Sequence, residues 1–304
     1  MPRVAAEAIW RRLLFVASAS LLVAPDAFAA DAPAAGPTVV QAVTVHPPAP
    51  KAEQEKRIHA FVGAVAQPVN QDGLVRWTRP ICPLEAGLAR DQGIYVIQRL
   101  SQVAKSVGAP VGPRHCEPNL FIAATTDPEK LARAWARHNR NYFKGRPAAV
   151  ARFQQTDHPV RVWYNAEFSG AAGQGDSPAA GLSSGYSQAP TITFADDSRL
   201  VFNAPRGLSS VILIIDGRRL DGIRTAALAD YVAMVGLTRM SPNTDPGDAP
   251  TILKLFDRPG PDGERPSGLT DWDRDFLRAL YQADQRDVHQ QGVIEAKVLG
   301  ELAR

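Results

Sequence analysis

The stretch VILIIDGRRLDGIRTAALADYVAMVGLTRM, residues 211–240, decides the fold that we expect for this chain. It begins with a short apolar run, which is typical of a buried strand. A turn follows, and after it comes a nearly continuous apolar segment of helical length. We therefore expect a strand and a helix that together form the floor of the main core.

The composition is that of a globular protein with a real core. Of the 304 residues, 45% are apolar and 21% are charged. The formal net charge is +3, and residues 1–29 contribute +1 of it through three arginines and two acidic residues, which leaves +2. No basic cluster stands out on this reading, so we do not expect a nucleic-acid partner.

The N-terminus has the three parts of a secretory signal peptide. Arg11 and Arg12 precede the apolar run LLFVASASLLVA, and Ala27-Phe28-Ala29 is a small-x-small cleavage site. We predict cleavage after Ala29 and a periplasmic or secreted location. The run is short for a membrane span, and no later run is longer, so no stable membrane anchor is expected.

Cys82 and Cys116 are the only cysteines in the chain. An oxidising compartment allows two cysteines to pair, so we predict a disulfide between them. A reactive thiol or a metal ligand is the alternative, although no CxxC motif is present.

The fold class that we predict is α+β, with an N-terminal α/β unit packed with a mixed sheet and helices. Apolar periodicity predicts helices over 52–66 and 91–107, and an apolar strand over 119–125 precedes a helix from Pro128. Side chains that alternate with the period of a strand predict a further strand over 159–168. The expected parts are a signal peptide (1–29), a flexible Ala/Pro-rich leader (30–51), an N-terminal α/β unit (52–145) and a C-terminal α+β lobe (146–304) with a flexible loop (169–190).

Two motifs match catalytic or metal-binding patterns only in part. The G-x-S-x-G match at residues 181–185 lies in a Gly/Ser-rich stretch, whereas a nucleophile elbow needs a strand before it and a helix after it. The sequence DWDRD at 271–275 begins like a calcium loop, but Phe276 and Gln282 stand where glycine and glutamate are required. We interpret it as a helix start capped by Thr270.

The histidines do not form a helical zinc motif, because none of the six pairs with another at i+3 or i+4. A site assembled from distant residues, for instance His115, His138 and His158, stays open. We predict no metal and no cofactor.

Asp230 is the candidate site residue, because it interrupts the apolar helix of the opening stretch. A buried carboxylate needs a partner. The candidate partners are Arg161, Arg218, Arg219 and Arg224. Asp230 is then either a site carboxylate with a shifted pKa or one half of a structural ion pair.

Five segments together resemble a family of uncharacterised secreted proteins from proteobacteria. This resemblance spans most of the chain after the leader, and it implies no activity and no site residues. The segments are WTRPICPLEAGL, CEPNLFIAATTDPEKL, TAALADYVAMVGL, PTILKLF and GLTDWDRDFLRALY.

The order of elements in the C-terminal half is also similar to that of zincin metalloproteases. In those enzymes the helix carries HExxH, and placing the motif here puts Asp230, Tyr231 and Met234 at the positions of His, Glu and His. The resemblance thus implies a scaffold without the zinc ligands and the general base.

The predicted function is that of an exported, non-catalytic cell-envelope binding or interaction protein, with an unknown envelope component as its partner. The alternative is a peptidase-like hydrolase with a non-standard site that involves Asp230.

Overall fold

The computed structural model describes residues 51–66, 74–143, 147–168, 206–240, 244–259, 264–284, 287 and 289–302. These residues belong to one compact unit, Ala49–Arg304. The predicted signal peptide, the leader up to residue 50, the loop 169–190 and the G-x-S-x-G match lie outside the described residues. Within the described ranges, no helix is both long and apolar enough to cross a membrane.

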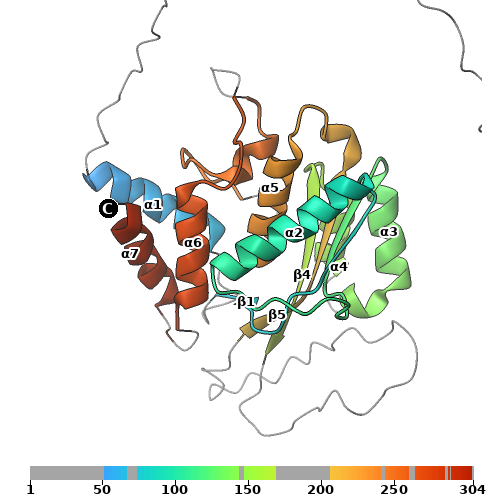
Figure 1. Ribbon diagram of the computed structural model, residues 1–304, viewed down its shortest axis with the longest axis horizontal. Helices are drawn as coiled ribbons and strands as arrows, with labels where there is room; N and C mark the ends of the chain where they lie inside the picture. The colour runs from blue at the N-terminus through green and yellow to red at the C-terminus, as the bar shows by residue number, and fades with distance from the viewer. Residues whose placement is uncertain are drawn as a thin grey trace, which may run out of the picture. The chain divides into compact units, whose positions relative to one another are not determined.

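The sheet is mixed, and β5 is its central strand (Figure 1). One edge of β5 pairs with β4 in antiparallel fashion, and its other edge pairs with β1 and β3 in parallel. β2 then pairs in parallel with the outer edge of β3. The strands are β1 (Arg76–Trp77), β2 (Pro83–Ala86), β3 (Leu120–Thr125), β4 (Val160–Phe168) and β5 (Arg206–Asp216).

β5 is central because its apolar run can be buried on both faces. Residues 211–215 are all 0% exposed. Alternate side chains enter two separate clusters: Val211, Leu213 and Ile215 join the larger core, whereas Ile212 and Ile214 join a smaller, aromatic-rich one.

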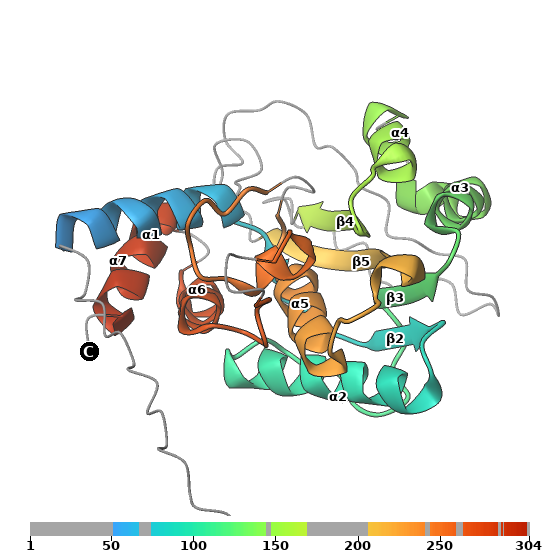
Figure 2. The ribbon, with the colours of Figure 1, turned by 90° about the horizontal axis from the view of Figure 1, so that it is seen from above.

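Helices cover both faces of the sheet (Figure 2). On the larger-core face, α2 packs against α5, and α6 and α7 continue that layer with α1. On the other face, α3 packs against α4 over the smaller cluster. The helices are α1 (Lys51–Val65), α2 (Arg90–Ser106), α3 (Pro128–His138), α4 (Pro147–Gln155), α5 (Thr225–Leu237), α6 (Asp271–Gln282) and α7 (Gln290–Leu302), with the 3-10 turns η1 (Arg140–Phe143), η2 (Gly217–Arg219) and η3 (Ile252–Phe256).

The C-terminal end of α5 is held by aromatic side chains, since the last carbonyls of a helix lack partners within it. Tyr164 donates its hydroxyl to the carbonyl of residue 235 at 2.9 Å, and Trp77 donates Nε1 to that of residue 236 at 2.8 Å. Tyr281 donates to the carbonyl of residue 237 at 2.9 Å. Strands β1 and β4 and helix α6 are thereby tied to one helix end.

The predicted α+β class is confirmed, and so are the strand and the helix of the opening stretch. The helix α4 was not predicted. It follows η1 closely and has only Phe153 buried, so its sequence carries a weak apolar pattern. β5, from the second half of the chain, pairs with β1 and β3 from the first half, so the two predicted parts share one sheet.

Candidate functional site

Asp230 is buried, and both of its carboxylate oxygens are engaged. Arg99 on α2 donates from Nε to Oδ1 at 2.5 Å and from Nη2 to Oδ2 at 3.1 Å. The backbone N–H of Leu269, just before α6, also donates to Oδ2 at 2.8 Å. The side chain of Asp230 is 6% exposed and that of Arg99 is 32% exposed. The carboxylate therefore joins α2, α5 and the segment that leads into α6.

The predicted partners of Asp230 were wrong. Arg218 and Arg219 both lie against Asp216, at 2.8 Å and 3.8 Å, and Arg161 donates to the carbonyl of residue 156 at 2.7 Å. Arg224 precedes α5 and makes no ion pair with a described carboxylate. No local signal marks Arg99, because it lies 131 positions before Asp230.

The pair is built as a structural link. The hydrogen bond to Asp230 raises the pKa of the Arg99 guanidinium. Gly268 passes so close that a Cβ there would lie 2.7 Å from Oδ2 of Asp230. The carboxylate is thus enclosed between an arginine and backbone, with no free oxygen aimed at solvent.

The two neighbours that matter for the zincin comparison are buried as well. Tyr231 is 4% exposed, and its ring meets that of Phe256 edge-on at 5.0 Å. Burial raises the pKa of Tyr231 above the ordinary tyrosine range. Met234 is 0% exposed. Both side chains belong to the core.

Asp216 and Asp273 are the other buried carboxylates among the described residues, and both have structural partners. Hydrogen bonds from Arg218 lower the pKa of Asp216, at the end of β5. Asp273 forms a capping box with Thr270 at the start of α6. The interpretation of DWDRD as a capped helix start is therefore confirmed. Asp273 also accepts from the N–H of Ile252 at 2.9 Å, and burial raises its pKa.

The hypothetical histidine site is not formed. Among the residues with described positions, no three His, Cys, Asp or Glu side chains gather as a metal site would need. His115 has a left-handed backbone (φ 64°), His138 ends α3, and His158 turns its Nδ1 to the backbone of Val160. His59 meets Glu295 at 3.0 Å and joins α1 to α7.

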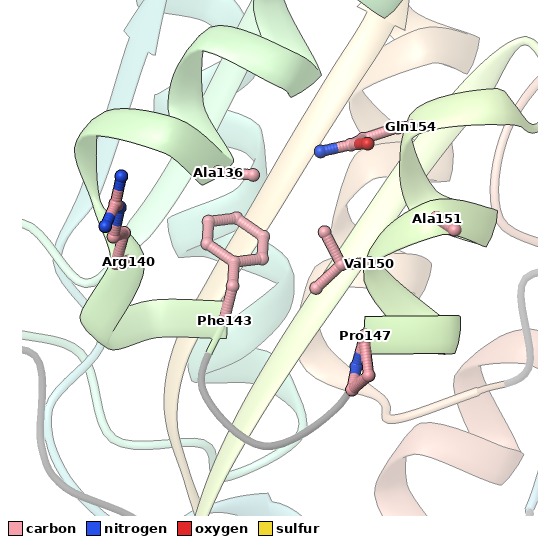
Figure 3. Close-up of a pocket in the computed structure, with 7 residues that line it drawn as sticks. All are labelled: Ala136, Arg140, Phe143, Pro147, Val150, Ala151 and Gln154. Atoms are coloured by element: carbon pink, nitrogen blue, oxygen red, sulfur yellow. The ribbon is translucent and has the colours of Figure 1, made fainter.

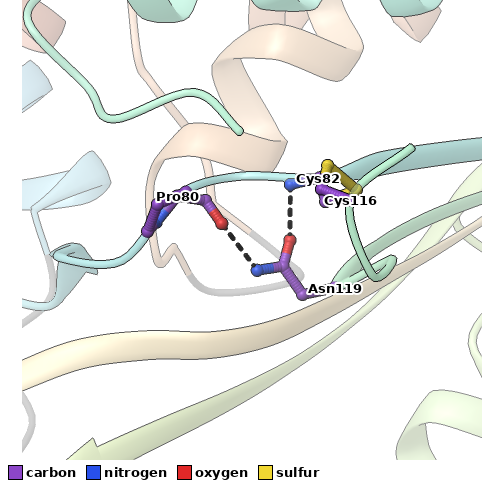
Figure 4. Close-up of a disulfide and its surroundings, with 4 residues drawn as sticks. All are labelled: Pro80, Cys82, Cys116 and Asn119. Atoms are coloured by element: carbon purple, nitrogen blue, oxygen red, sulfur yellow. Dashed lines mark hydrogen bonds between the residues drawn. A yellow bond between two sulfur atoms is a disulfide. The ribbon is translucent and has the colours of Figure 1, made fainter. Parts of the chain in front are cut away.

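Cys82 and Cys116 form the predicted disulfide, with their Cα atoms 5.8 Å apart (Figure 4). Asn119 lies beside it, accepts from the N–H of Cys82 at 2.8 Å and donates to the carbonyl of Pro80 at 2.9 Å. The bridge thus fastens the loop before β3 to the start of β2. Its reactive-thiol alternative is overturned, since neither sulfur is free.

A small cavity lies between β4 and α5. It has about 30 Å³ of space and is lined by residues such as His158, Tyr164 and Tyr231. That space is enough for one or two water molecules and too small for a substrate, since ligand pockets measure about 300–1,000 Å³.

A larger groove of about 400 Å³ lies on the opposite face of the sheet, between α3, η1 and α4. Figure 3 shows Phe143 at its centre, Val150 pointing toward that ring, and the polar side chains of Arg140 and Gln154 on either side. The lining residues are Ala136, Arg140, Phe143, Pro147, Val150, Ala151 and Gln154. Of these two hollows in the described part of the chain, the groove has the room to take a ligand group, and none of the residues predicted as site residues lies in it.

No family model, curated protein or solved structure matches this chain.

Proposed function

We propose that this chain is an exported, non-catalytic binding or interaction protein of the cell envelope. The observation that carries the proposal is the bonding of Asp230. A general base or nucleophile needs a free oxygen within reach of a substrate, whereas both oxygens of Asp230 are used within the fold. The open groove between α3 and α4 supports binding as the function, because it offers apolar side chains with a cation beside them.

Export is the second part of the proposal. It is supported by the signal-peptide pattern of residues 1–29 and by the Cys82–Cys116 disulfide, which is typical of an oxidising compartment. We propose cleavage after Ala29. The partner is proposed to be an envelope component.

The family resemblance and the zincin-like scaffold also remain proposals. The support for the family resemblance is the five sequence segments, and the support for the zincin-like scaffold is the order of β5, α5 and α6. On such a scaffold Asp230, Tyr231 and Met234 would replace the metal ligands and the base with an ion pair, an aromatic ring and a core thioether.

Two measurements test the proposal. The full chain is expressed in a Gram-negative host, and the periplasmic and culture fractions are examined by N-terminal sequencing, with Ala30 expected as the first residue. The purified protein is then incubated with fluorescein-labelled casein, and no hydrolysis is expected. Retention in the cytoplasm would contradict export. Hydrolysis that disappears in a folded Asp230→Asn variant would establish the hydrolase alternative instead.

A further inference from the structure

The segment that forms the α3–α4 hairpin is strongly basic. Residues 130–156 contain seven lysines and arginines and no aspartate or glutamate, and the acidic residues next to this window are Asp127 and Glu129 at the start of α3 and Asp157 after α4. The whole chain has 34 basic and 31 acidic residues, so the remainder carries 27 against 31. The expectation that this chain has no basic cluster is therefore wrong. The near-neutral total conceals it, because the acidic residues lie elsewhere in the chain.

Several of these cations are exposed and unpaired. Arg137, Arg140 and Arg152 are exposed, and none lies within 4.0 Å of a carboxylate in the described part of the chain. Arg133 is the exception, since it pairs with Glu129 one turn earlier on α3. Within the part of the chain that the structure describes, no carboxylate therefore neutralises these three arginines.

The groove between the two helices has an apolar floor. Phe143 is 6% exposed, and its ring packs at a tilt against Trp163 of β4, with centroids 4.7 Å apart, and against Phe153 of α4, with centroids 5.7 Å apart. Trp163 belongs to β4, so the floor of the groove packs directly against the sheet. Arg140 extends from the side of the groove (Figure 3). An incoming chain would find an apolar depression with a guanidinium beside it.

We propose that this groove docks an acidic polypeptide segment of a partner, which inserts one apolar side chain over Phe143 and places its carboxylates against Arg140 and the neighbouring cations. The inference rests on the proposed binding function and names the surface and the partner chemistry for it. Charge complementarity selects an acidic partner over a basic one. The guanidinium fork suits carboxylates in particular.

Other occupants fit the geometry less well. The groove is a shallow depression open to solvent, whereas a small ligand is usually held in a pocket that buries most of its surface. A membrane surface would need protruding apolar side chains, and here Phe143 is recessed. A segment laid along the gap between two helices is a common recognition mode.

The test uses the purified protein as it is recovered after export. The probe is a short fluorescein-labelled peptide of aspartates and glutamates around one central phenylalanine, and binding is followed by fluorescence anisotropy. Comparison peptides replace the acidic residues by lysine or the phenylalanine by glycine. The groove variants are Arg140→Glu and Ala151→Asp. Lys56→Glu, on α1, is the matched control, because Lys56 is also exposed on a helix and unpaired among the described residues.

We expect the acidic peptide to bind, and the lysine and glycine versions to bind at least about tenfold more weakly. Arg140→Glu and Ala151→Asp should each weaken binding by about tenfold, Lys56→Glu by less than about twofold, and added salt should weaken it further. Circular dichroism confirms that each variant is folded.

Several results would overturn the inference: no preference for the acidic peptide, an equal loss in Lys56→Glu, or an Arg140-dependent interaction with phosphatidylglycerol vesicles or a single-stranded oligonucleotide in place of the peptide. Self-association that Arg140→Glu abolishes in sedimentation velocity would assign the groove to a second copy. None of these results would contradict the proposed function, which fails only if the protein is not exported or hydrolyses a substrate. A failure of the groove inference can therefore be told apart from a failure of the proposed function.

Discussion

Arg99 and Asp230 lie 131 positions apart in the chain and meet through two hydrogen bonds, from Nε to Oδ1 at 2.5 Å and from Nη2 to Oδ2 at 3.1 Å. The pair joins α2 to α5, which pack against each other on the larger-core face of the sheet. The remaining contact of Asp230, with the N–H of Leu269, reaches the segment before α6. One carboxylate therefore fixes three parts of the larger core.

Asp230→Asn should lower the free energy of unfolding by about 2–3 kcal/mol, because a buried, charge-assisted pair loses one partner. This loss of stability is smaller than for a fully buried ion pair, because Arg99 is partly exposed and water can hydrate it. Urea unfolding at pH 7 measures it. Asp157→Asn, a change at a fully exposed carboxylate, should shift the same free energy by at most about 0.5 kcal/mol. Equal shifts in both variants would remove the structural role of Asp230.

The disulfide should contribute about 3–4 kcal/mol in the chain-entropy model, since it closes a loop between residues 34 positions apart. Urea unfolding of the wild type, with and without reductant, and of the double variant Cys82→Ser/Cys116→Ser measures this difference. Thiol titration of the unfolded, unreduced protein should find no free thiol. Two free thiols would show that the bridge does not form on export.

Gly87→Ala should lower the free energy of unfolding by about 2–4 kcal/mol, because strain and a steric clash act together. Gly87 has φ +100°, and a Cβ there would lie 1.9 Å from the carbonyl oxygen of Ala124 on β3. Gly108→Ala is the matched control. Gly108 has φ +82°, but no atom lies within 4 Å of an added Cβ, so the free energy of unfolding should fall by only about 1 kcal/mol. Similar losses at both positions would mean that the clash is relieved by a backbone shift.

The contact between His59 and Glu295 should be pH-dependent. The hydrogen bond to Glu295 raises the pKa of His59 above its ordinary value. A raised pKa means that the folded state holds the proton more tightly than the unfolded state. This contribution to stability is fully present below the ordinary histidine pKa of about 6.5, and it is lost as the pH rises through the folded value.

NMR titration of the His59 ring measures that pKa directly. Glu295→Gln should return it toward the ordinary value, whereas Glu53→Gln, on the same helix as His59, should leave it unchanged. The midpoint of urea unfolding should fall less between pH 6 and 8 in Glu295→Gln than in the wild type. An unchanged His59 titration in Glu295→Gln would contradict the contact.

The elements that sequence reasoning predicted well are those with strong local patterns. Helix α2 has a clear apolar periodicity, whereas the strand at residues 211–216 and helix α5 are apolar runs whose lengths fit a buried strand and a buried helix. The cap of α6 was predicted because Thr270 and Asp273 lie within one turn of each other. Helix α4 was missed, since a short Ala-rich helix with one buried aromatic has almost no pattern to detect.

The candidate groove could not be predicted in the same way. Its lining comes from α3, η1 and α4, and its floor depends on Trp163 of β4 packing against Phe143 and Phe153. Each of these side chains, taken alone, is an ordinary core residue. The basic composition of residues 130–156 was visible in the sequence, and counting charges in windows would have found it.

The sequence by itself determined the α+β class, the pairing of the only two cysteines and the need of Asp230 for a partner, because these follow from local periodicity, from parity and from the cost of burying a charge. Only the tertiary structure decided that the partner is Arg99, that both oxygens of Asp230 accept hydrogen bonds within the fold, and that an apolar groove opens beside Arg140. The physical reason is that Arg99 and Asp230 lie on elements far apart in the chain, and that the groove depends on how α3 and α4 pack against each other and against the sheet. No local sequence pattern sets either arrangement.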